Sequence, residues 1–161
     1  QRELGKKVWP ANYNMDGQLV LAGLKADLES LTDTFKEAGA KRAIVLDMSV
    51  ASHCELLTSA VENLKPYLDE FLKDEFLPVI SNVSTNAYKT KDEAIELLSA
   101  QLTSPVKYKQ SIIAHENEVD LFIEFGNGIV LKGLNRKITK VPTVNVSDMK
   151  TLESVIGELN D

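Results

Sequence analysis

The segment RAIVLDMSVASHCELL, residues 42–57, joins two sequence patterns and decides how the rest of the chain is interpreted. Residues 42–48 are mostly apolar, which is typical of a buried strand, and a helix-like pattern begins after Cys54. Cys54 is the only cysteine of the chain, and His53 beside it is one of two histidines. Three roles are open for His53 at this junction: a residue of the helix start, a metal ligand or a general base.

The composition bounds the class of protein. A chain of 161 residues with 43% hydrophobic and 26% charged residues is typical of a folded domain rather than a disordered one. We find no apolar run of membrane-spanning length and no apolar core of a signal peptide, and one cysteine excludes an internal disulfide. We therefore expect a cytoplasmic protein without a membrane partner. The net charge of −6 disfavours a nucleic-acid partner.

Residues 8–48 predict a small unit of strand, strand, helix and strand. Asp16-Gly17 is a strong turn signal between two strand-like runs, and residues 24–38 have apolar side chains at helical spacing before a stop at Gly39. Residues 42–48 supply the third strand. The opening QRELGKK is typical of the last turn of a helix, so we expect its helix to begin further upstream.

The remainder of the chain predicts alternating strands and helices. Residues 53–73 are helical with an interruption at Pro66, and strands are expected at 77–82, 119–125 and 143–146. Helices are expected at 91–102, 107–116 and 129–138, and Asp148 is a candidate N-cap of a closing helix. Such alternation favours an α/β layer with parallel strands.

The residues themselves leave the role of His53 open. A metal site is disfavoured, because zinc needs three or four ligands and the chain offers one cysteine and the distant His115. Ser52 could instead cap the following helix, with His53 in its first turn. As a base, an imidazole would accept and return a proton near neutral pH. A base also needs a nucleophile, and no Gly-x-Ser-x-Gly turn occurs in the sequence.

Two further features could bind a partner. The glycines of residues 126–128 lie between a predicted strand and a predicted helix, where backbone N–H groups can face an anion such as a phosphate or coenzyme A. A tight structural turn is the alternative. Lys41 and Arg42, and the basic cluster of residues 136–140, could dock an acidic partner or simply form solvated faces.

Several separated blocks resemble a known family. The blocks ANYN, GQLVLAG, KEAGAKRAIVLDMSVASHCELL, LPVISNV, LLSAQLTSPVKYKQSI and FIEFGNGIVLKGLNRKI occur in this order and spacing in bacterial malonyl-CoA:acyl carrier protein transacylases. The resemblance spans nearly the whole chain, but it covers only the C-terminal half of such an acyltransferase. It implies an α/β fold, with a partial ferredoxin-like subdomain at residues 1–48 and the C-terminal part of an α/β-hydrolase-like parallel-sheet core at residues 49–161.

The resemblance implies roles for individual residues. His53 falls on the catalytic histidine, and Gln101 falls on the glutamine whose backbone carbonyl orients that histidine. Asn12, Asn14 and Ser52 fall on substrate-binding positions near the acyl pocket. The family passes malonyl from coenzyme A to the phosphopantetheine thiol of acyl carrier protein through an acyl-serine. It uses coenzyme A thioester as a substrate, and we expect no separate cofactor and no metal.

The resemblance also implies binding partners, and it shows which parts of the family's active site this sequence lacks. Lys41, Arg42 and Arg136 match basic positions expected to dock the acidic acyl carrier protein. The nucleophilic serine belongs to the N-terminal half of the family, so we expect this chain alone to be inactive and its apolar strands to lack neighbours. Two departures stand out: Gly-Asn-Gly-Ile at residues 126–129 replaces the usual Gly-Pro-Gly-Lys, and Ser52 replaces a phenylalanine common in malonyl-selective relatives. The alternative function is a non-catalytic module that docks the carrier protein.

Overall fold

The computed structural model describes residues 5–160, so the helix end predicted at the first residues lies mostly outside the described part. The chain forms short strands and helices in alternation. In chain order they are β1 (Val8–Met15), β2 (Gln18–Gly23), α1 (Lys25–Ser30), α2 (Thr32–Glu37), the 3₁₀ helix η1 (Glu55–Leu57), α3 (Thr58–Phe71), β3 (Glu75–Ile80), β4 (Ala87–Thr90), α4 (Lys91–Gln101), α5 (Tyr108–His115), β5 (Phe122–Phe125), α6 (Val130–Ile138), β6 (Thr143–Val146) and α7 (Met149–Asn160).

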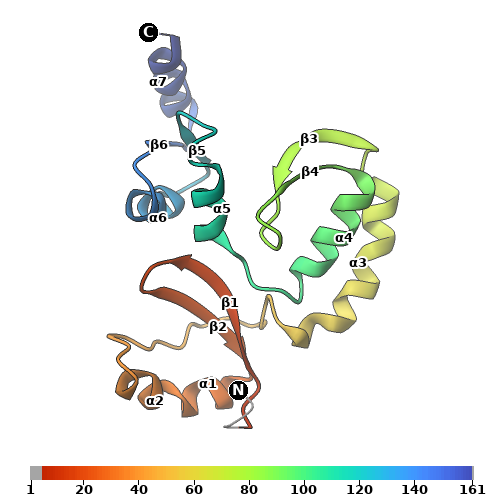
Figure 1. Cartoon of the computed structure of the whole chain (residues 1–161), viewed down its shortest axis with the longest axis vertical. Helices are drawn as coiled ribbons and strands as arrows, with labels where there is room; N and C mark the ends of the chain where they lie inside the picture. The colour runs from red at the N-terminus through yellow and green to blue at the C-terminus, as the bar shows by residue number, and fades with distance from the viewer. Residues whose placement is uncertain (1–4, 161) are drawn as a thin grey trace.

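The described strands pair two by two into three small sheets, each with its own helices (Figure 1). β1 and β2 are antiparallel, β3 and β4 are antiparallel, and β5 and β6 are parallel. The helices α1 and α2 follow the first sheet, α3 and α4 lie side by side next to the second, and α6 and α7 lie next to the third (Figure 1). This mixed architecture confirms the predicted α/β class.

The predicted hairpin at the start of the chain is confirmed. Gly17, with a φ of 76°, turns β1 into β2, and glycine is favoured there because other residues seldom adopt a positive φ. The helix predicted over residues 24–38 is divided at the buried Leu31 into α1 and α2. Gly39, with a φ of 100°, ends α2 as predicted.

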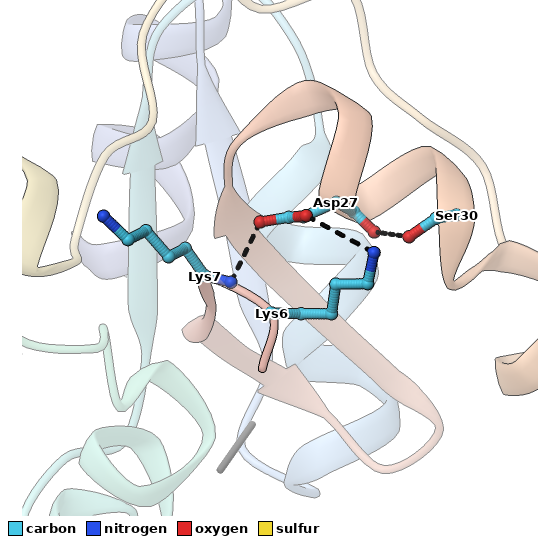
Figure 2. A network of polar contacts seen from close by, with 4 residues as sticks. All are labelled: Lys6, Lys7, Asp27 and Ser30. Atoms are coloured by element: carbon cyan, nitrogen blue, oxygen red, sulfur yellow. Dashed lines mark hydrogen bonds and ion pairs between the residues drawn. The ribbon is translucent and has the colours of Figure 1, made fainter. Parts of the chain in front are cut away.

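Asp27 connects the helix α1 to the start of the first strand (Figure 2). Its carboxylate accepts a hydrogen bond from the backbone N–H of Lys7 at 3.0 Å and lies 3.6 Å from the Lys6 ammonium. The backbone N–H of Leu24 donates to the Lys7 carbonyl at 3.2 Å, so the main chain of Lys7 is paired on both sides. These contacts fix the angle at which α1 leaves the hairpin.

The segment after α4 joins the hairpin to the rest of the molecule. Val106 pairs with β1, because its carbonyl accepts from the N–H of Tyr13 at 2.9 Å and its N–H donates to the Ala11 carbonyl at 2.8 Å. The next residue, Lys107, donates its N–H to the Asn82 carbonyl at 2.9 Å. A short stretch of backbone thus ties β1 to the turn between β3 and β4.

The strand predicted at residues 42–48 is wrong: this segment is irregular. Its apolar side chains are exposed, with Ile44 and Met48 each 70% accessible. A strand needs a neighbouring strand to pair its backbone groups, and no described segment lies beside this one in a ladder. An apolar pattern alone therefore did not suffice to form a strand here.

Two other expectations were wrong in detail. Pro66 does not interrupt its helix, since α3 continues through it and packs along α4. That packing offsets the single hydrogen bond that a proline removes. The strand β4 was not predicted, and it pairs antiparallel with β3, so only β5, α6 and β6 form the expected parallel unit.

Asp148 caps α7 as predicted, accepting from the N–H of Thr151 at 2.8 Å. Among the described helices, none is long and apolar enough to cross a membrane.

We predict that Asp27→Ala lowers the free energy of unfolding by about 1–2 kcal/mol, because it leaves the Lys7 N–H without its charged acceptor. Asp27→Asn retains an acceptor oxygen and should cost less. The control is Asp33→Ala, which removes an exposed ion pair with Lys36 and should change stability by about 0.5 kcal/mol or less. Urea unfolding followed by circular dichroism gives all three values, and equal losses for Asp27→Ala and Asp33→Ala would contradict this role of Asp27.

Candidate active site

His53 has a strained backbone and a defined ring orientation. Its φ of 59° places a non-glycine residue in the left-handed region, which is uncommon and concentrates at functional sites. The ring Nδ1 lies 2.9 Å from the backbone carbonyl oxygen of Gln101. A carbonyl can only accept, so in the neutral ring Nδ1 carries the hydrogen and Nε2 keeps its lone pair. The half-buried ring is thus arranged as a base through Nε2.

Cys54 anchors the turn that carries His53. Its side chain is 1% exposed and packs in a small cluster with Ala11 of β1 and Ala22 of β2. The thiol donates to the carbonyl of Ala51 at 3.6 Å. A buried thiol engaged in packing is a structural residue rather than a nucleophile. Cys54 also occupies the N-cap position of η1, so the alternative that Ser52 caps this helix is wrong.

The end of α4 positions the Gln101 carbonyl. The last carbonyls of a helix have no partner within it, so this oxygen is available for His53. The start of α4 is fixed by a capping box, in which the Glu93 carboxylate accepts the backbone N–H of Thr90 at 3.2 Å. The Thr90 hydroxyl also donates to this carboxylate, at 2.7 Å. The Thr90 contact is the leading cause that lowers the pKa of Glu93. The Gln101 side chain accepts from Asn82 Nδ2 at 3.4 Å, a contact that the sequence did not indicate.

The predicted substrate-binding residues lie on the hairpin and beside the histidine. Asn12 and Asn14 are half-buried on β1, and Asn12 forms a parallel bridge with Val106. Ser52 is half-buried next to His53. Within residues 5–160, neither asparagine side chain nor the Ser52 hydroxyl hydrogen-bonds to His53. The structure thus brings His53 and Gln101 together, with the hairpin attached through Cys54.

The predicted docking residues are exposed on separate elements. Lys41 and Arg42 lie in the irregular segment after α2, and Arg136 lies on α6. Arg136 lines an open hollow of about 570 Å³ between the ends of α5 and α6. The other residues of this hollow are Glu116, Asn117, Lys137, Ile138, Thr139, Lys140 and Val141. Basic side chains predominate among its charged groups.

The glycine turn of residues 126–128 is closed by internal contacts. Asn145 Nδ2 donates to the carbonyls of Gly126 at 3.3 Å and Gly128 at 2.6 Å. The buried carboxylate of Glu124 accepts the N–H groups of Leu131 and Lys132, each at 2.9 Å. The donors at the start of α6 are therefore already used by an anionic side chain. Of the two interpretations of residues 126–128, this geometry therefore favours a tight structural turn and disfavours a binding site for a phosphate or coenzyme A.

A polar network continues beneath this turn. The Tyr108 hydroxyl donates to Asn135 Oδ1 at 2.7 Å, and Asn135 Nδ2 donates to the Thr143 hydroxyl at 3.1 Å. Burial, and next the nearby Glu124 carboxylate, raise the pKa of Tyr108, which keeps its hydroxyl protonated as a donor. Asn135 is buried with both amide atoms paired. These contacts join α5, α6 and β6 below the turn.

The site fits part of an α/β acyltransferase or hydrolase: a candidate base, His53, is held by the backbone carbonyl at the end of α4, next to the β1–β2 hairpin. No family model matches the chain. The malonyl CoA-acyl carrier protein transacylase of Bacillus subtilis is 43% identical over 162 residues, which cover 99% of this chain and 51% of the relative. The Haemophilus influenzae transacylase is 35% identical over 158 residues, covering 96% of this chain and 51% of the relative.

Solved structures agree with these relatives. The malonyl-CoA:acyl carrier protein transacylase of Helicobacter pylori superposes with a TM-score of 0.95 at 46% identity, covering 99% of this chain and 52% of that one. A malonyl-transacylase solved in complex with its type II polyketide acyl carrier protein has a TM-score of 0.89 at 33% identity, covering 96% and 51%. The chain therefore spans about half the length of the relatives that it matches.

The predicted resemblance is confirmed: this chain is related along nearly its whole length to the C-terminal half of malonyl-CoA:acyl carrier protein transacylases. The predicted fold class is confirmed as well. These structural neighbours combine an α/β-hydrolase-like core with a ferredoxin-like subdomain.

We predict that Glu124→Ala lowers the free energy of unfolding by about 1–3 kcal/mol, because it leaves two N–H groups at the start of α6 without an acceptor. The control is Glu153→Ala, an exposed carboxylate on α7 that should change stability by less than about 0.5 kcal/mol. Chemical denaturation measures both variants. If Glu124→Ala were neutral, the capping role of Glu124 would be excluded.

Proposed function

We propose that this chain provides the general base, and part of the carrier-protein surface, of a transacylase that moves malonyl from coenzyme A to acyl carrier protein. The single observation that carries this proposal is the 2.9 Å contact between His53 Nδ1 and the Gln101 carbonyl. It leaves the Nε2 lone pair as the proton acceptor. The similarity to transacylases over 99% of the chain supplies the class of reaction.

The proposed chemistry takes place in two matched steps. In the first, Nε2 of His53 accepts the proton of a serine hydroxyl while the serine oxygen attacks the malonyl thioester. The imidazolium then returns this proton to the sulfur of the departing coenzyme A, leaving malonyl-serine. In the second step, the phosphopantetheine thiol of the carrier protein gives its proton to His53 and its sulfur attacks the ester. The serine hydroxyl is restored when the imidazolium returns the proton.

A neutral carbonyl behind the histidine has a specific consequence. It selects the tautomer and the ring orientation, as a carboxylate does in a hydrolase triad, but it brings no negative charge. The imidazolium formed in each step is therefore stabilised by one hydrogen bond rather than an ion pair. The serine itself belongs, by this proposal, to the N-terminal half of the enzyme. Asn12, Asn14 and Ser52 would line the malonyl pocket that the two halves share.

The exposed apolar surface supports a second half of the enzyme. Phe125 on β5 is 72% exposed and Leu77 on β3 is 86% exposed, although strand residues of this type are normally covered. The irregular segment of residues 42–48 adds further apolar side chains. This surface agrees with the expectation that apolar strands lack neighbours. We propose that the N-terminal half covers it and that the chain alone has no transacylase activity.

The carrier-protein surface follows from charge. Lys41, Arg42 and Arg136 are exposed cations on a chain of net charge −6, and an acidic carrier would be steered to such local patches. A related transacylase has been solved with its acyl carrier protein, which makes a carrier partner the simplest expectation. We also propose a cytoplasmic enzyme without a separate cofactor, divided into a small subdomain at residues 1–48 and a core segment at residues 49–161.

The alternative function is a docking module that binds acyl carrier protein without catalysis. It would use the same basic residues but would not need the His53–Gln101 contact. The strained φ of His53 favours the enzyme, because such strain persists where a side chain must be aimed.

We predict that His53→Ala lowers kcat by about 10²–10⁴-fold. The assay joins this chain to the N-terminal half of the Bacillus subtilis relative and follows malonyl transfer to acyl carrier protein. The unjoined chain, assayed in parallel, should show no transfer. Carrier binding should be unchanged in His53→Ala, which separates a lost base from a lost docking surface. Full turnover by His53→Ala would contradict the role of His53 as the base, and carrier binding without turnover in the unchanged joined enzyme would favour the docking module. Transfer by the unjoined chain would contradict the proposed division of the site.

We predict that the double variant Lys41→Glu/Arg42→Glu, and separately Arg136→Glu, raises the KM for acyl carrier protein with little change in the KM for malonyl-CoA. The effect should shrink at high salt, because exposed charges are screened. Lys150→Glu is the matched control, since it reverses an exposed cation on α7. An equal change of KM in the control would mean that net charge, rather than these residues, determines carrier binding.

A further inference from the structure

We propose that Asn82 is a positioning residue for His53, and that the turn carrying Asn82 is held in place by the protonated ring of His115. This inference rests on the proposed role of His53 as a base. Neither the sequence patterns nor the resemblance assigned a positioning role to Asn82 or His115. The argument follows one continuous set of hydrogen bonds from α5 to the ring of His53.

Asn82 lies where three segments meet. It follows β3, its carbonyl accepts the N–H of Lys107 at 2.9 Å, and its side-chain amide donates to the Gln101 side chain at 3.4 Å. The carbonyl of Gln101 holds the His53 ring at 2.9 Å. Lys107 directly follows Val106, which pairs with β1. Asn82 therefore links the end of α4 to residues 106–107, which pair with the hairpin strand β1. The end of α4 in turn holds the ring of His53.

The turn that begins at Asn82 is closed by its own hydrogen bonds. Ser81 is buried, and its hydroxyl accepts from the N–H groups of Val83 at 3.1 Å and Ser84 at 3.2 Å. Its carbonyl accepts from the N–H of Thr85 at 2.9 Å. Thr85 has a φ of 66°, which is strained for a β-branched residue. A contact from outside the turn can offset part of this strain.

His115, at the end of α5, supplies that contact. Its Nε2 lies 2.9 Å from the Thr85 carbonyl oxygen, and its Nδ1 lies 2.7 Å from the Glu118 carboxylate. A carbonyl and a carboxylate are both acceptors, so both ring nitrogens must donate at once. Only the imidazolium has two N–H groups. The neutral ring can keep one of these two bonds and has to lose the other.

The surrounding charges support the protonated form. The hydrogen bond to Glu118, followed by the one to the Thr85 carbonyl, raises the pKa of His115 above its usual value. Two elements of the described chain pack against α5 and bring charged groups near it. The β1–β2 turn brings Asp16, which pairs with Lys109 of α5. The helix α6 brings Arg136 and Lys137, which line the same hollow as Glu116. Within residues 5–160, Glu118 forms its ion pair with His115 itself.

The direction of the pH effect follows from this raised pKa. We call the two hydrogen bonds from His115 to Thr85 and Glu118 the clamp. Below the ordinary histidine pKa of about 6.5, the ring is protonated whether or not the clamp is present, so the clamp is fully formed. As the pH rises through the higher pKa of the folded state, the second hydrogen bond and its stabilisation are lost. The carboxylate of Glu118 is a stronger acceptor than a carbonyl, so the neutral ring keeps its hydrogen on Nδ1 and releases Thr85. The link from Asn82 through Gln101 to His53 then loosens.

Imidazole nuclear magnetic resonance tests the proposal directly, because the chain has two histidines and hence two sets of ring signals. Long-range ¹H–¹⁵N spectra of this chain, recorded from about pH 5 to about pH 9, report the tautomer and titration of each ring. We expect His115 to titrate above the ordinary value and His53 to show the Nδ1–H tautomer. The His53 signals should show a second inflection where His115 titrates.

Three variants assign the cause. His115→Gln should remove the second inflection of His53, and Glu118→Gln should move it to lower pH together with the titration of His115. Asn82→Ala should reduce the Nδ1–H share of His53 at every pH, whereas Asn86→Ala, an exposed asparagine of the same turn, should not. If Asn82→Ala fails to fold, His115→Gln still decides the outcome. A single His53 inflection in the unchanged chain, or one that persists in His115→Gln, would overturn the proposal.

The outcomes separate this inference from the proposed function. Activity of the joined enzyme tests the base through His53→Ala, and the ring spectra test its positioning. A large activity loss in His53→Ala with no coupling between the rings would retain the function and reject the clamp. Coupled rings with a fully active His53→Ala would reject the function and retain the clamp as a structural device.

Discussion

The hydrogen bond from His53 to the Gln101 carbonyl links the turn after the hairpin unit to the end of α4. It joins residues 48 positions apart in sequence, and it determines which ring nitrogen is left to accept a proton. Both partners are held by packing and capping elsewhere: Cys54 lies in the hairpin core, and α4 starts in a capping box. The small hairpin unit and the helical segment therefore matter to the chemistry because they fix the two ends of one bond.

The second constraint is the incomplete sheet surface. A sheet of two strands is marginal in water, and the described part of the chain has three such pairs. Apolar side chains at Leu77 and Phe125 are left open on them. The segment of residues 42–48 shows the same constraint locally, since it has the pattern of a strand but no strand of residues 5–160 pairs with it. An exposed apolar surface of this kind is suited to contact with another protein segment.

The glycine turn illustrates how tertiary contacts close a site that a motif leaves open. Glycines between a strand and a helix are compatible with an anion site, and the helix start of α6 offers the expected donors. Glu124 occupies those donors from β5, and Asn145 binds the carbonyls of the turn. The negative group that the helix favours is thus part of the protein. A motif alone cannot distinguish the two cases, because both need the same glycines.

The hairpin, the α/β class, the cap at Asp148 and the resemblance that includes His53 and Gln101 could all be predicted from the sequence. Local patterns suffice for these features, because turns, caps and periodicity depend on residues near one another. The fold was needed to show that residues 42–48 form no strand, that β4 pairs with β3, and that α3 passes through Pro66. It also introduced Asn82 and His115, whose contacts with Gln101 and Thr85 join distant segments. Such contacts depend on which segments the fold brings together, and no local pattern of residues encodes that choice.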